Sequence, residues 1–120
     1  MSLTVTVTEK EGAVIMIAPV GSVDATTCAI LEEHVDSALR KSPKVVVFEM
    51  HGVEYISSAG IRVILKAQKA MKAAGGEMTM VRLQPKVKKV FDIIRALPSQ
   101  QIFASVEELD AYLDKIQKGV

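Results

Sequence analysis

Two adjacent serines, Ser57 and Ser58, are the residues of this chain whose type and position best suit chemistry. They separate an apolar strand-like stretch, Val53–Ile56, from a helical pattern that begins near Ala59. The first turn of a helix exposes backbone N–H groups without partners inside the helix. A serine there accepts from them as an N-cap, and the same donors and the helix dipole favour a phosphate. One serine is therefore a candidate phosphorylated switch, although the two-serine pattern alone favours plain capping.

The first part of the chain predicts a β-hairpin. Thr4–Thr8 alternates polar and apolar side chains, which is typical of a half-buried strand. Glu11-Gly12 predicts a turn, and Val14–Ala18 predicts a second, more buried strand. Pro19 and Gly21 are expected to end that strand.

Strands and helices alternate through the rest of the chain. The expected strands are Val45–Met50, covered on both faces, then Glu77–Leu83 and a short one at Ile102-Phe103. The expected helices run from about Ala25 to Arg40, from Ala59 to Ala74, from Val87 to Ile94 after Pro85, and onward from the capping box Ser105–Glu108. This order predicts an α/β fold with a mixed four- to five-stranded sheet covered by about four helices, in a single domain over residues 1–120.

Composition narrows the classes of function. The 120 residues carry a formal net charge of +1, which argues against a broad electrostatic grip on nucleic acid. Cys28 is the single cysteine, so no internal disulfide forms and a reducing compartment is expected. No apolar run approaches the ~20 residues of a membrane span, and no signal peptide is evident at the N-terminus. We therefore expect a cytoplasmic protein that does not insert into membranes.

Catalytic and cofactor motifs are not recognisable. His34 and His51 lack the spacing of metal ligands, and Gly75-Gly76 predicts a helix stop rather than a phosphate-binding loop. No acid–base pair or nucleophile triad can be placed. The sequence predicts no metal, no cofactor and no enzymatic activity, and it selects no oligomeric state.

Four segments, in order, resemble the STAS domain, the fold of bacterial anti-sigma factor antagonists and of the cytoplasmic tails of sulphate transporters. Gly21–Ala25 resembles the segment Gly-x-Leu-Asp before the first helix of that family. Val45–Ile61 resembles the strand–loop–helix signature, with an aromatic residue followed by a motif of the type Asp-Ser-Ser/Thr-Gly. Ala74–Glu77 and Ser105–Ala111 resemble the later Gly-Gly turn and the start of the terminal helix. The resemblance covers nearly the whole chain.

The resemblance implies a function as well as a fold. Antagonists of this family bind an anti-sigma factor that is also a serine kinase, and thereby free a sigma factor. Phosphorylation of the motif serine abolishes the binding, and a serine phosphatase restores it. Aligned on Gly60, that serine is Ser58. The partner-binding residues implied here are Asp24, Tyr55, Ser57, Ser58, Ala59, Gly60 and Arg62.

The motif departs from the family pattern at several positions. Ser57 replaces the aspartate, Ala59 occupies the second hydroxyl position, and Glu49 and His51 replace the usual residues at the end of the preceding strand. Ser58 remains the expected phosphorylation site because its spacing to Gly60 is kept, with Ser57 as the fallback. Its hydroxyl is expected to lie in open solvent. The missing aspartate also supports an alternative, a STAS scaffold or adaptor without phosphorylation in a signalling assembly or transporter system.

Overall fold

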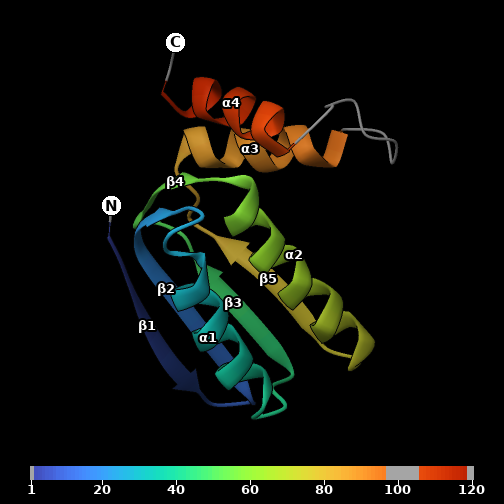
Figure 1. Ribbon diagram of the computed structural model, residues 1–120. Helices are drawn as coiled ribbons and strands as arrows, with labels where there is room; N and C mark the ends of the chain where they lie inside the picture. Colours follow the sequence, from blue (N-terminus) through green and yellow to red (C-terminus); the bar gives the residue numbers. More distant parts are fainter. Residues whose placement is uncertain (1, 97–105, 119–120) are drawn as a thin grey trace.

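The computed structural model describes residues 2–96 and 106–118. Its elements are β1 (Leu3–Lys10), β2 (Val14–Val23), α1 (Cys28–Leu39), β3 (Val45–Glu49), β4 (Val53–Ile56), α2 (Ser58–Ala73), β5 (Glu77–Val81), α3 (Pro85–Ala96) and α4 (Val106–Gln117) (Figure 1). Five strands and four helices in this part of the chain confirm the predicted α/β class. The strand expected at Ile102-Phe103 lies outside the described residues.

The sheet is mixed, with the strand order β1-β2-β3-β5 and with β4 paired to β2. β1 and β2 form the predicted antiparallel hairpin, in a register from Leu3 opposite Gly21 to Lys10 opposite Val14. All other pairs are parallel: β2 with β3, β2 with β4, and β3 with β5. Strand β2 therefore lies at the centre and leads directly to the first helix.

The expectation that Pro19 and Gly21 end the second strand is wrong, because β2 continues to Val23. Beyond β1, strand β2 pairs with β3 only as far as Ile17 and with β4 only from Gly21 onward. The Gly21 N–H donates to the Gly52 carbonyl, away from β1, and by the two-residue period of a strand the ring nitrogen of Pro19 points to that same side. Proline has no N–H to donate. At Pro19 no hydrogen bond is lost, because neither β3 nor β4 pairs with β2 at this residue.

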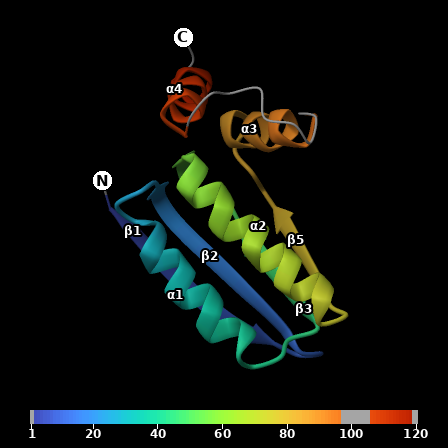
Figure 2. The same ribbon diagram turned by 45° about the vertical axis from the view of Figure 1, so that its right-hand side comes forward.

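Helices α1 and α2 lie side by side on one face of the sheet, and α3 and α4 cross its end (Figure 2). The side chains of β3 alternate accordingly, with Val46 and Phe48 buried and with Val45, Val47 and Glu49 only half-buried. The expectation that this strand is covered on both faces is therefore wrong. The core under the two helices includes Ile15, Ile17, Val23, Leu31, Val35, Ile56, Ile61, Ile64, Ala67 and Met71.

The first turn of α2 packs closely on the ends of β2 and β4 because residue 60 is glycine. A Cβ atom at Gly60 would lie 2.6 Å from Val23 Cγ1, 2.8 Å from Ile56 Cγ1 and 3.0 Å from the Val23 carbonyl oxygen. Val23 and Ile56 are fully buried. The missing side chain thus sets how near the helix start lies to the sheet.

We predict that Gly60→Ala lowers the free energy of unfolding by about 1–3 kcal/mol, the usual cost of overpacking. Helix propensity alone predicts the opposite sign, a gain of about 1 kcal/mol. Urea denaturation measures the difference, and the cost should shrink in a Val23→Ala background, where one of the clashing atoms is removed. Stability that rises in Gly60→Ala would contradict the close packing.

Candidate functional site

The two serines stand at the start of α2, as the sequence predicted. Ser57 is the N-cap residue, with extended backbone angles (φ −96°, ψ 177°), and Ser58 is the first helical residue. The Ser57 N–H donates to the Val23 carbonyl at 2.9 Å, and the Ser57 carbonyl accepts from the Ile61 N–H at 2.9 Å. The helix start is therefore fixed to the end of β2.

The expectation that the Ser58 hydroxyl lies in open solvent is wrong. Ser58 is 8% exposed and Ser57 is 6% exposed. In the part of the chain that the structure describes, neither Oγ atom has a hydrogen-bond partner. Neither serine side chain caps α2, so the simple capping interpretation is also wrong. Both hydroxyls are buried polar groups without compensation, an arrangement that costs about 1–3 kcal/mol per group.

The element that closes the site is α4. The Ser58 N–H donates to Asp110 Oδ1 at 2.8 Å, so a carboxylate from the far end of the chain caps α2. The Gln117 amide is 5% exposed and pairs with both backbone groups of Ile56, at 2.7 Å to the N–H and 2.6 Å to the carbonyl. Sequence reasoning missed both residues. They lie 52 and 61 positions from their partners, and no local pattern marks them.

Asp24 organises the turn that leads from β2 into α1. Its Oδ1 accepts from the Thr26 N–H at 2.9 Å, the Thr26 hydroxyl at 2.7 Å and the Thr27 N–H at 3.1 Å. The hydrogen bond from the Thr26 hydroxyl is the largest cause that lowers the pKa of Asp24. Because this turn occupies residues 24–27, α1 begins at Cys28 and not near Ala25.

Tyr55 lies half-buried on β4 between these features. Tyr55 pairs with Ser22 of the parallel strand β2, two residues before Asp24. Burial, followed by the negative charge of Asp114 and the hydrogen bond to it, raises the pKa of Tyr55 to about 12, and the charges of Asp110 and Asp24 add to the shift. The tyrosine thus lies among three carboxylates, two of them on α4.

A groove of about 510 Å³ lies beside the serines. Ile61, Leu65, Ile94 and Leu109 give it an apolar lining, and Ser58 lies at its edge. Its basic residues, all on α2, are Arg62, Lys66 and Lys69. The surface next to Ser58 is therefore apolar with a positively charged border.

The structure brings some of the residues expected to bind a partner together and places the others further along α2. Asp24, Tyr55, Ser57 and Ser58 lie together where β2, β4 and α2 meet, as described above. Arg62 is exposed one turn further along α2. Ala59 is half-buried and Gly60 is buried, so Gly60 supports the site through packing.

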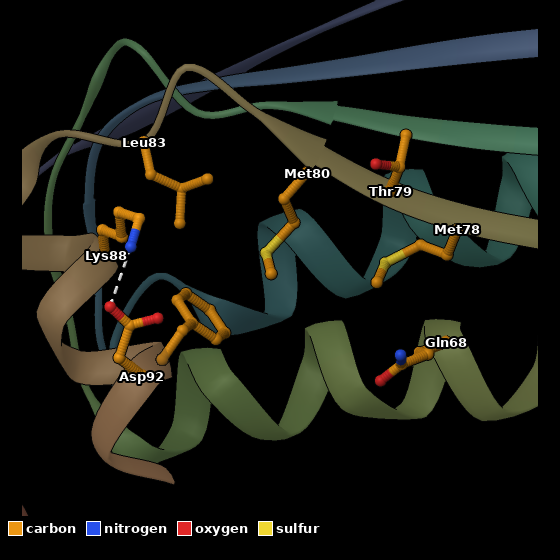
Figure 3. Close-up of a pocket in the computed structure, with 8 residues that line it drawn as sticks. Gln68, Met78, Thr79, Met80, Leu83, Lys88 and Asp92 are labelled. Atoms are coloured by element: carbon orange, nitrogen blue, oxygen red, sulfur yellow. Dashed lines mark hydrogen bonds and ion pairs between the residues drawn. The ribbon is translucent and has the colours of Figure 1, made fainter. Parts of the chain in front are cut away.

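A second cavity, of about 290 Å³, lies between α2, β5 and α3 (Figure 3). Met78 and Met80 point into it from β5, and Gln68 lies on the α2 side. Lys88 and Asp92 form an ion pair of 2.9 Å at its α3 side. Its lining offers no nucleophile with an adjacent base. Within residues 2–96 and 106–118, no three His, Cys, Asp or Glu residues gather as metal ligands, and no helix is long and apolar enough to cross a membrane.

A model of the STAS domain matches residues 4–109. The chain belongs to the STAS family. Solved structures of anti-sigma factor antagonists also resemble this fold over most of the chain. SpoIIAA, an anti-sigma factor antagonist, superposes in its unphosphorylated form with a TM-score of 0.64 at 14% identity, over 98% of this chain and 100% of that one. The phosphorylated form of SpoIIAA, from Bacillus, gives a TM-score of 0.64 over 76% of this chain and 83% of that one, also at 14% identity.

Two curated relatives carry names from the same group of STAS proteins. The putative anti-sigma factor antagonist BtrV of Bordetella bronchiseptica is 34% identical over 73 residues, which is 61% of this chain and 63% of BtrV. The anti-sigma-F factor antagonist RsfB of Mycobacterium tuberculosis is 32% identical over 63 residues, 52% of this chain and 51% of RsfB. The matched region thus spans between half and two thirds of these relatives.

We predict that Asp24→Ala lowers the free energy of unfolding at neutral pH by about 1 kcal/mol, the typical value of a capping side chain. The folded-state pKa of Asp24 is lowered from 3.8. Its stabilisation is therefore present above pH 3.8 and is lost as the pH falls through the lower, folded-state value. Urea denaturation across this range tests the sign, with Asp36→Ala on α1 as the control. An equal loss from both variants would contradict the role of the turn.

We also predict that Tyr55 titrates near pH 12 in the folded protein. The raised pKa means that the neutral phenol stabilises the fold below pH 10, and that this contribution is lost as the pH rises towards 12. Asp114→Asn should lower the pKa of Tyr55 towards 10. Ultraviolet absorbance of the tyrosinate measures it in a Tyr112→Phe background, where Tyr55 is the remaining tyrosine. An unchanged titration in Asp114→Asn would exclude the contact.

Proposed function

We propose that this STAS protein is an anti-sigma factor antagonist. In its unphosphorylated form it binds a cognate anti-sigma factor that is also a serine kinase, and so releases a sigma factor. Phosphorylation of Ser58 ends the binding, and a serine phosphatase restores it. It acts as a binding module rather than as an enzyme. Both curated relatives are named as antagonists, and SpoIIAA is known in both phosphorylation states.

The single observation that carries the proposal is the position of Ser58. It is the first residue of α2, where backbone donors and the helix dipole stabilise a phosphate. In the transfer, Ser58 Oγ forms a bond to the γ-phosphorus of ATP, ADP leaves, and the hydroxyl proton passes to a base of the kinase. The product adds about −1.5 to −2 charges at neutral pH.

The groove beside Ser58 supports the choice of partner surface. Its apolar lining gives a second protein area to bury, and Arg62 and Lys69 on its border suit an acidic partner. A phosphate at Ser58 places a hydrated dianion at the edge of that surface. A hundredfold loss of affinity requires only about 2.7 kcal/mol, which desolvation of one such group supplies.

Two observations favour the alternative, a STAS scaffold or adaptor that is not phosphorylated. The Ser58 hydroxyl is buried, and Ser57 replaces the aspartate that the family resemblance places beside the phosphorylated serine. Under this alternative the same surface binds its partner without a covalent switch. The two functions differ in whether a kinase labels the chain.

We predict that the cognate anti-sigma factor and ATP transfer one phosphate to Ser58, located by peptide mass spectrometry. Ser58→Ala should abolish labelling, whereas Ser57→Ala, a neighbouring buried serine, should keep it. Both variants should fold with unchanged or slightly higher stability, because each removes a hydroxyl without a hydrogen bond.

Calorimetry should show that the phosphorylated protein binds the anti-sigma factor about a hundredfold more weakly. Labelling that persists in Ser58→Ala and disappears in Ser57→Ala would move the switch to Ser57. Complex formation without any labelling would support the scaffold function. Absence of both would overturn the proposal.

A further inference from the structure

Helix α4 lies beyond the first turn of α2, at the end of the sheet (Figures 1 and 2). Asp110 holds the Ser58 N–H at 2.8 Å. One helical turn on, Asp114 lies near Tyr55, where its negative charge helps to raise the pKa of the phenol. Near the end of the helix, Gln117 occupies both backbone groups of Ile56. Three polar side chains of α4 thus lie against Tyr55, Ile56 and Ser58, at the end of β4 and the start of α2.

The attachment of α4 is otherwise small. Of its side chains that the structure describes, only Leu113 and Gln117 are buried. The apolar side of this 12-residue helix consists of one buried leucine, Leu113, and the half-buried Leu109 and Ile116, which also pack against the core. This is a small apolar contact for a helix to resist displacement. The hydroxyls of Ser57 and Ser58 beside it are buried and have no hydrogen-bond partner among the described residues.

A phosphate on Ser58 would compete with Asp110 of α4 for a donor at the α2 N-terminus. Asp110 already accepts from the Ser58 N–H, which is a donor that a phosphate at a helix start uses. A phosphorylated Ser58 would also bring a dianion against the carboxylate of Asp110 on α4. Like charges at such short range oppose closure.

We propose that α4 is a displaceable cover of the α2 N-terminus, and that its Asp110 carboxylate competes there with a phosphate on Ser58. In the closed state Ser58 is protected from modification. Release of α4 exposes the hydroxyl, and a phosphate then holds α4 in the released position. The role of the phosphate rests on the proposed function, whereas the cover itself does not.

Thiol alkylation tests the cover without any kinase. In a Cys28→Ala background, Ser58→Cys places a single thiol under α4, and iodoacetamide alkylates it with loss of iodide. We expect Asp110→Ala and Gln117→Ala each to raise the alkylation rate by about tenfold, the factor that corresponds to about 1.4 kcal/mol. Glu107→Ala removes the same charge from an exposed position of the same helix and should leave the rate unchanged.

Urea denaturation of each variant separates local opening from global unfolding. The cover is supported if the rate rises more than the loss of global stability explains. Equal rates in all variants, or a rise that matches global destabilisation, would overturn it.

A second measurement tests the competition. Asp110→Ala should raise the rate of Ser58 phosphorylation by the anti-sigma factor about tenfold, with Glu107→Ala as the control. Labelling of Ser58 that is insensitive to Asp110→Ala would overturn the competition and leave the proposed function intact. Faster alkylation in a chain that no kinase labels would support the cover and count against the proposed function alone.

Discussion

The start of α2 needs an acceptor for its first N–H groups, and the way this need is met shapes the whole site. A serine hydroxyl is the ordinary solution, and two serines are in place. The structure instead uses the Asp110 carboxylate, a charged acceptor that forms a stronger hydrogen bond than a hydroxyl. That contact joins α4 to the helix start, and both serine hydroxyls remain buried without hydrogen-bond partners among the described residues.

The same end of the sheet gathers every other feature of the site. β2 changes partner from β3 to β4 around Pro19, so its last residues lie beside β4 and close to the start of α2. Gly60 allows the first turn of α2 to approach Val23 and Ile56. Asp24 then turns the chain into α1 at the point where β2 ends. A short stretch of strand ends thus positions a carboxylate, a phenol and two serines together.

Membership of the STAS family and the position of Ser58 support the proposal of an antagonist switched by phosphorylation. Because the Ser58 hydroxyl is buried, a kinase would reach it only after the structure around it opens. A switch residue that is covered in one state links modification to the movement of a helix, because ligand-driven changes require a difference in interaction between two states. In the proposed switch, the charge of Asp110 supplies that difference.

The sequence by itself determined the local elements. The alternation of Thr4–Thr8 predicted the hairpin, Pro85 marked the start of α3, and the order of the segments from Gly21 to Ala111 indicated the STAS fold. These features depend on neighbours in the chain, and local patterns record them well. The sequence also located the serines at a helix start, because capping and helical periodicity are local too.

Only the tertiary structure decided which groups surround those serines. The pairings of Asp110 with Ser58 and of Gln117 with Ile56 join residues 52 and 61 positions apart, and no periodicity encodes such contacts. Coverage of β3 on one face was equally hidden, because a run of apolar residues fits a strand buried on one face or on two. Exposure, unlike helix propensity, is a property of the folded chain. Ser58 was therefore expected in open solvent but is buried.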